Sequence, residues 1–117
     1  MPNRDSFVAL ACETLAPLGD ITSRAMFGGH ALYCDGLVFA LIGNNTLYLK
    51  ANNETEKIFL AAGLEAFRPF PDKPETMRYH RAPDNFFDDP DVMRYWAGVA
   101  LQAASAPKAR KKSGRKA

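Results

Sequence analysis

The sequence predicts an α+β fold in which one antiparallel sheet is covered on one face by helices. Two observations support this prediction. Apolar residues recur at helical spacing near both ends of the chain, and the middle holds short aliphatic and aromatic runs separated by turn residues. Helices and strands segregated in this way pack as two layers. We therefore expect the element order α-β(3)-α-β(2)-α.

Composition and charge limit the class of protein. The chain has 117 residues, 47% hydrophobic and 24% charged, and a chain of this length can bury about two-thirds of the surface that its unfolded form exposes. No apolar run approaches the roughly 20 residues that span a bilayer, and no signal-peptide pattern opens the chain. We expect a cytoplasmic domain over residues 1–106 without a membrane partner.

The first helix is predicted from apolar residues on one face, namely Phe7, Leu10, Ala11, Leu15 and Leu18. Asn3 or Asp5 can cap its start. Pro17 disfavours helical geometry at the residue before it, so this helix should end near Leu15 or Ala16.

Residues 24–51 change to the periodicity of strands. Bulky residues between turn signals predict a three-stranded antiparallel meander here. Asp35-Gly36 is a strong hairpin signal because both residues tolerate the positive φ of a type I′ turn, and Asn44-Asn45 can form the next reversal. Gly28-Gly29 falls inside the first of these strands, where we expect a bulge or a sharp bend.

A second helix is predicted after Asn53, which forms a capping-box pattern with Glu56, and Gly63 should end it. Two further strands are expected over residues 66–70 and 76–82. The proline-rich residues between them are too irregular to be anything but a loop.

The last helix should begin at Asp89-Pro90-Asp91, because Asp caps well and proline suits the first helical position. One apolar face is predicted to contain Val92, Tyr95, Trp96, Val99, Ala100 and Ala103. Helices then cover one face of the sheet. The opposite face should be polar or meet a partner.

The sequence contains no pattern typical of a catalytic or metal site. His30 and Cys34 are four residues apart, which on a strand separates them by ~13 Å, too far for one zinc ion. A nucleophilic pair of Cys12 or Cys34 with His30 or His80 would lack an orienting third group. We expect both cysteines to be free thiols, and we predict no enzymatic activity, no metal and no cofactor.

Charge divides the chain into an acidic body and a basic tail. Residues 108–117 contain six basic residues and no acidic one, whereas residues 1–107 carry nine basic and 13 acidic residues. We expect residues 107–117 to be disordered. The tail offers six candidate nucleic-acid contacts, which would be nonspecific in sequence: Lys108, Arg110, Lys111, Lys112, Arg115 and Lys116. A solvated tail that needs no partner is the alternative.

Stacking of aromatic residues on single-stranded nucleic acid is a second alternative. It would require several aromatic side chains exposed together on the open sheet face, beside basic residues. The acidic charge of the body argues against it.

Several short motifs resemble the N-terminal domain of the TfoX (Sxy) family of competence regulators over about residues 5–104. They are Arg24-x-Met26-Phe27-Gly28-Gly29, Tyr33-x-Asp35-Gly36, Leu47-Tyr48-Leu49-Lys50, Met77-x-Tyr79 and Trp96. The resemblance implies a two-layer α-β(3)-α-β(2)-α fold similar to type III secretion chaperones. The resemblance also implies that the motif residues have structural roles. The chain departs from the family at His30-Ala31, and it has a basic tail where full-length competence regulators carry a second helical domain.

The functional expectation is a non-enzymatic regulatory module that acts by protein contact. We expect a homodimer, and the resemblance implies a transcription-regulator partner. Two alternatives stay open: a nucleic-acid-binding protein driven by the tail, and a small-ligand-binding module with a pocket between sheet and helices.

Overall fold

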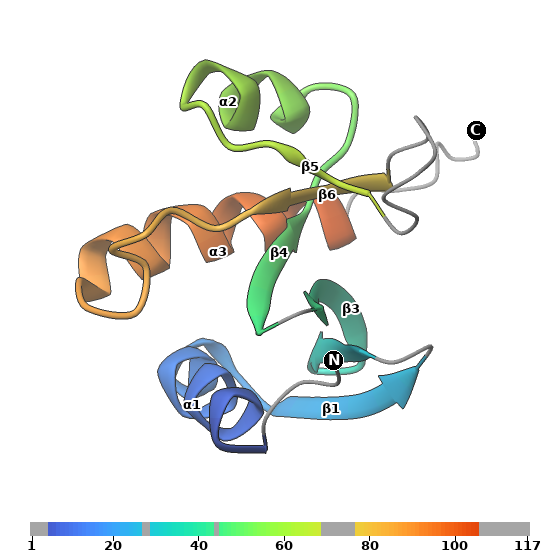
Figure 1. Cartoon of the computed structure of the whole chain (residues 1–117), viewed down its shortest axis with the longest axis vertical. Coiled ribbons are helices and arrows are strands. Elements are labelled where there is room, and N and C mark those ends of the chain that lie inside the picture. Colours follow the sequence, from blue (N-terminus) through green and yellow to red (C-terminus); the bar gives the residue numbers. More distant parts are fainter. Residues whose placement is uncertain (1–4, 27–28, 44, 69–76, 106–117) are drawn as a thin grey trace.

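A six-stranded antiparallel sheet, in the order β1-β2-β3-β4-β6-β5, forms the centre of the structure (Figure 1). The computed structural model describes residues 5–26, 29–43, 45–68 and 77–105, so the basic residues 108–117 lie outside it. The predicted α+β class with one antiparallel sheet is confirmed. The strands are β1 (Ile21–Met26), β2 (Gly29–Cys34), β3 (Leu37–Gly43), β4 (Thr46–Lys50), β5 (Ala66–Phe67) and β6 (Met77–Arg81).

The described helices share one side of this sheet. They are α1 (Asp5–Leu15), which a short 3-10 turn (Ala16–Leu18) follows, α2 (Thr55–Ala61) and α3 (Pro90–Ser105). Helix α3 packs across β3 and β4, α1 packs against β1 and α2 against β6, and both shorter helices also contact α3. None of the described helices has the length and apolar character required to cross a bilayer.

The prediction of three strands in the first meander was wrong, because there are four. Met26 pairs with Gly29, so the residues between them separate two strands and do not bend one long strand. Apolar periodicity alone does not tell one long strand from two consecutive ones. Of the predicted bend at Gly28-Gly29, Gly29 begins the second strand, and Gly28 lies outside the described residues. The first strand also begins earlier than predicted, at Ile21.

The predicted hairpin turn at Asp35-Gly36 is confirmed, with positive φ angles of 51° and 86°. This turn is also held against the end of the α1 region. The Asp20 N–H donates to Asp35 Oδ1 at 3.0 Å, and the Asp35 N–H donates to the Asp20 carbonyl at 2.9 Å. Gly19 permits the close approach, since a Cβ there would lie 2.9 Å from Asp35 Oδ2.

Two helix starts tested the capping predictions. Asp89 caps α3 as predicted, with its Oδ1 accepting from the Asp91 N–H at 3.0 Å. The cap of α2 lies one residue earlier than predicted. Asn52 Oδ1 accepts from the Thr55 N–H, and Thr55 Oγ1 accepts from the Asn52 N–H, both at 2.8 Å. Asn52 and Thr55 therefore form the reciprocal pair, which leaves Glu56 available for a different contact.

The core lies between the helices and one face of the sheet. Its largest fully buried apolar side chains include Phe39, Phe59 and Phe86. The predicted apolar face of α3 is partly wrong. Tyr95 is 55% exposed, whereas Met93 and Ala97 are buried, so the buried face of the helix includes Met93 and Ala97 in place of Tyr95.

Candidate interaction surface

The sheet face opposite the helices carries a distinct set of side chains, which we call the open face. Leu32, Ile42 and Leu49 belong to the buried core cluster, and side chains alternate between faces along a strand. The neighbouring positions therefore point away from the helices. With Phe67, which contacts Tyr48, the open face includes Arg24, Ala31, Tyr33, Leu41, Tyr48, Lys50, Phe67, Tyr79 and Arg81.

One cross-strand row runs through the middle of the open face. Consecutive pairings join Arg24, Ala31, Leu41, Tyr48 and Arg81 across five strands. The centre of the row is dry, since Ala31 is 2% and Leu41 5% exposed although both lie outside the helix-side core cluster. Arginines stand at the two ends. The row therefore has apolar side chains in its middle and an arginine at each end.

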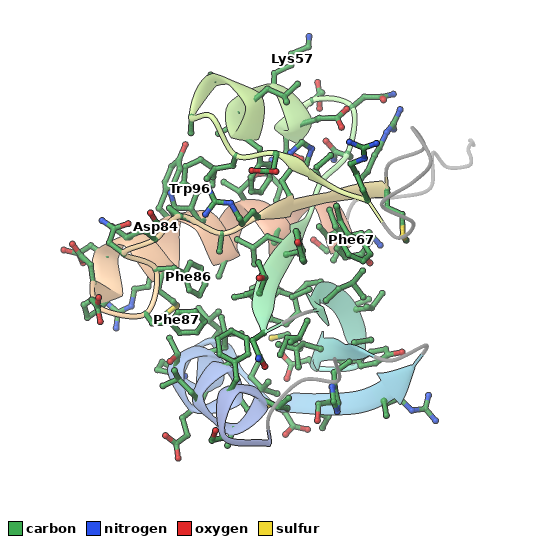
Figure 2. All side chains as sticks on the ribbon, viewed as in Figure 1. Lys57, Phe67, Asp84, Phe86, Phe87 and Trp96 are labelled. Atoms are coloured by element: carbon green, nitrogen blue, oxygen red, sulfur yellow. The ribbon has the colours of Figure 1, made fainter. Side chains whose placement is uncertain are left out.

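Phe67 supplies part of the cover over this dry centre. Its ring centroid lies 4.6 Å from that of Tyr48, and a Cβ added to Gly43 would lie 3.5 Å from the ring. Figure 2 shows the Phe67 side chain pointing from the β5 and β6 end of the sheet toward β3. Phe67 therefore packs against Tyr48 and beside Gly43 on the open face.

Three of the chain's four tyrosines lie on the open face. Tyr33, Tyr48 and Tyr79 are all half-buried. Burial is the main cause that raises the pKa of the Tyr48 hydroxyl, and the negative charge of Glu65 adds to it. Burial, with a smaller contribution from Tyr33, likewise raises the pKa of Tyr79. These side chains combine an apolar body with a neutral hydroxyl, as is common at protein interfaces.

Charge is distributed unevenly between the two sides of the molecule. The six strands contain four basic residues, Arg24, Lys50, Arg78 and Arg81, and no Asp or Glu. Arg81 has acidic neighbours from the loops: its guanidinium lies 3.0 Å from Asp84 Oδ1 and 3.7 Å from Glu65 Oε1. The acidic side chains of the described residues lie in helices, turns and loops. The open face therefore carries the basic side chains of Arg24, Lys50 and Arg81, of which Arg81 is paired with two carboxylates. Arg78 lies on the helix side with His80.

The structure distributes the predicted motif residues over several places. Arg24, Tyr33, Lys50 and Tyr79 share the open face, and Trp96 stands on the other side, where its ring lies 5.1 Å from that of Phe59. The remaining positions mark element ends: Met26 ends β1, Gly29 begins β2, Asp35-Gly36 forms the turn and Met77 begins β6. Phe27 and Gly28 lie outside the described residues, as do the six basic residues of the tail.

Sequence reasoning missed a buried polar contact on the helix side. His80 is fully buried, its Nδ1 lies 2.7 Å from the Leu64 carbonyl and its Nε2 lies 3.1 Å from Glu56 Oε2. Its ring also stacks on Phe59 at 5.1 Å. Both ring nitrogens face oxygen atoms, so the contact ties α2 and the segment after it to β6. Alternation with Tyr79 was the available signal, because it places His80 on the face opposite that tyrosine.

The two thiols are free and lie apart from any reactive arrangement among the described residues. Burial raises the pKa of Cys34, and the carboxylates of Asp35 and Asp20 raise it further. Burial also raises the pKa of Cys12, against a hydrogen bond with Ser23 that lowers it. A raised pKa reduces the thiolate fraction that a nucleophile requires. Within the described ranges, no three His, Cys, Asp or Glu side chains are grouped so that they could hold a metal ion.

A cavity of about 240 Å³ lies where α1 meets the ends of β4 and β6. Phe7, Thr46, Pro83 and Phe87 line it together with the Arg81 and Asp84 pair. Its volume is below the roughly 300 to 1,000 Å³ that is usual for small-molecule sites. The open face is therefore the stronger candidate for function.

The model of the TfoX N-terminal domain family matches residues 13–104. The chain belongs to this family. The match includes all six strands, α2 and almost all of α3, so it covers both faces of the sheet. No curated protein shows significant similarity to the chain. Membership in the TfoX N-terminal domain family agrees with the resemblance read from the motifs.

Proposed function

We propose that this TfoX N-terminal domain is a non-catalytic regulatory module that acts in the cytoplasm by protein contact through its open face. The observation that supports this proposal is the open face itself, where three half-buried tyrosines surround a dry apolar centre beside basic side chains. Tyrosine and arginine are enriched at protein interfaces.

The charge of the open face defines the chemistry of the partner. Arg24 is an exposed basic residue of this face, and the described strands contain no Asp or Glu. A partner with a complementary surface presents acidic groups around an apolar or aromatic anchor. The family resemblance makes a transcription regulator the partner class to test first.

The test is affinity capture from the native cell with the full chain as bait. A double variant, Arg24→Glu with Tyr79→Ser, reverses one charge and removes one ring on the open face. Lys57→Glu is the matched control, since Lys57 lies exposed on α2, far from β1 (Figure 2). We expect the double variant to lose the captured partner and the control to keep it. Equal capture by both folded variants would contradict the proposal.

Single-stranded nucleic acid is a second candidate, which one observation favours. The open face places the half-buried Tyr33, Tyr48 and Tyr79 together, and it also carries Arg24 and Lys50. Grouped aromatic and basic side chains are what base stacking requires. The basic tail would then add nonspecific attraction.

Anisotropy measurements on single-stranded and duplex oligonucleotides separate the two nucleic-acid hypotheses. If the tail drives binding, deletion of residues 108–117 abolishes it. If the open face drives it, the deleted chain still binds single strands, and Tyr33→Ser with Tyr79→Ser removes that binding.

A further inference from the structure

The outer edge of β1 is a second feature suited to an intermolecular contact. Among the described residues β1 pairs with β2 alone, at one end of the sheet, and Figure 1 shows it at the border of the molecule, beside α1. The strand has six residues, and its register with β2 is regular throughout. The edge strand at the other end, β5, has only two residues.

The hydrogen bonds to β2 determine which backbone groups of β1 point outward. The Asp35 N–H donates to the Asp20 carbonyl, one position before the Ile21 and Cys34 pair. Bonded and non-bonded pairs alternate in an antiparallel ladder, so Thr22 and Arg24 bond to β2. The N–H and C=O groups of Ile21, Ser23 and Ala25 therefore face away from the sheet.

Little on β1 protects this row of unpaired groups. Thr22, Ser23, Arg24 and Ala25 are all exposed. Edge strands are commonly protected by proline, by bulges, by short length or by several charges. This strand has neither a proline nor a bulge, and Arg24 is its one charged residue.

We propose that a second copy of this chain pairs with β1 in antiparallel fashion, with the two-fold axis at Ser23. In this register Ser23 exchanges two backbone hydrogen bonds with the partner's Ser23. Ile21 and Ala25 bond to the partner's Ala25 and the partner's Ile21. All the outward-facing N–H groups of the three residues are then paired, and so are their carbonyls.

Charge selects this register over the neighbouring one. Centred on Ser23, the pairing places Arg24 opposite the partner's Thr22. Centred on Arg24, it would place the two guanidinium groups directly opposite each other, where like charges are destabilising. The Ser23 register avoids that repulsion and also makes more hydrogen bonds.

The inference rests on the proposed function, to which it adds the interface for self-association. A two-fold axis through paired Ser23 residues keeps both open faces on the same side of one continuous sheet. Two copies would then present two tyrosine surfaces to one partner, and linked binding sites bind more tightly than either alone.

Sedimentation of the full chain, at concentrations from about 1 to 100 μM, tests this interface. Ser23→Pro removes the outward N–H of Ser23 while leaving the bonds of Thr22 and Arg24 to β2 in place. Losing both central hydrogen bonds should weaken the dimer about tenfold to a hundredfold. Ser23→Ala is the matched control, because it removes the hydroxyl but keeps the N–H, and it should dimerise like the original chain.

A charge experiment tests the register without relying on proline. Thr22→Glu would place a carboxylate opposite the partner's Arg24, and Thr22→Lys would place a second cation there. The pair of residue 22 with the partner's Arg24 occurs twice in the dimer. We therefore expect Thr22→Glu to lower the dissociation constant of the dimer about twofold to tenfold and Thr22→Lys to raise it similarly.

The outcomes separate this inference from the proposed function. A chain that stays monomeric at about 100 μM, the highest concentration of the series, would overturn the β1 interface. A Ser23→Pro variant that dimerises unchanged would also overturn it. Capture that still depends on Arg24 and Tyr79 would leave the open-face proposal standing in that case. Equal dimerisation of Thr22→Glu and Thr22→Lys would reject the Ser23 register.

Discussion

The two faces of the sheet bury comparable side chains by different means. On the helix side, Leu49, Phe39 and Phe59 are fully buried because α2 and α3 pack over the strands. On the open face, Leu41 is 5% exposed, and strand side chains such as Tyr48 and Phe67 lie around it. The comparison teaches that helices bury one face of the sheet, whereas on the other face side chains of the strands themselves pack against one another.

The largest expected effect comes from the matched pair Leu49→Ala and Leu41→Ala. Leu49 is enclosed by sheet and helices, so its truncation leaves a cavity that cannot collapse and should cost about 3 to 5 kcal/mol. Tyrosine and phenylalanine rings on the open face can move into the space left by Leu41, which should reduce the cost to about 1 to 3 kcal/mol. Urea unfolding followed by circular dichroism measures both.

Equal costs for the two leucines would mean that the open face is as rigid as the core. A control for the method is Leu60→Ala, because Leu60 is 60% exposed on α2 and should change the free energy of unfolding by less than about 0.5 kcal/mol.

The buried histidine provides the next test of the helix side. His80→Leu preserves bulk but removes the contacts with the Leu64 carbonyl and Glu56. A buried carbonyl without a partner makes this change cost about 2 to 4 kcal/mol in the free energy of unfolding. Glu56→Gln should cost about 1 kcal/mol alone and nothing further in the His80→Leu background, because the two changes remove the same contact. Additive costs in this double-mutant cycle would show that the two side chains are energetically independent.

The comparison of the two faces also shows what the sequence could and could not predict. The Asp35-Gly36 turn and the Asp89 cap depend on the chemistry of adjacent residues, so they were predicted correctly. The division of the first strand into β1 and β2, and the cap at Asn52, each differ from the prediction by a small local shift. Periodicity alone does not determine such shifts, because the same alternation fits either arrangement.

The candidate site is harder to predict because its side chains come together only through the pairing register of several strands. Tyr48 meets Arg81 and Phe67 only after β4 pairs with β6 and β6 pairs with β5. His80 and Glu56 are similarly brought together from separate elements. The sequence did predict that the sheet face opposite the helices must be polar or meet a partner. Which side chains form a row across five strands could be seen only once the strand pairings were known.

Alkaline titration tests the burial of the tyrosines. The pKa values of Tyr48 and Tyr79 are raised above the ordinary 10.0, mainly by burial. An unfolded tyrosine ionises near pH 10, so the stability that these hydroxyls contribute is fully present below that pH. It is lost as the pH rises through the higher folded values. We expect the free energy of unfolding to fall above about pH 10.

Phenylalanine variants assign this loss to the open face. Tyr48→Phe and Tyr79→Phe should unfold like the original chain at pH 7 and lose less stability above about pH 10. Identical alkaline curves for the variants and the original chain would mean that these hydroxyls do not contribute.

The smallest expected effect concerns the acidic border of the helix side, where Cys34 lies. Its pKa is raised first by burial and then by the carboxylates of Asp35 and Asp20. Asp35→Asn keeps an oxygen for the Asp20 N–H and tolerates the positive φ of the turn, but it removes one negative charge. The pKa of Cys34 should fall, and its alkylation by iodoacetamide at pH 8 should quicken about twofold to fivefold.

Cys12 is the internal control, because no carboxylate contributes to its raised pKa. Mass spectrometry can follow both thiols in one sample, and equal acceleration at Cys12 and Cys34 would indicate that the variant had loosened the fold. A selective change at Cys34 would instead show that the Asp35 carboxylate contributes to the raised pKa of that thiol.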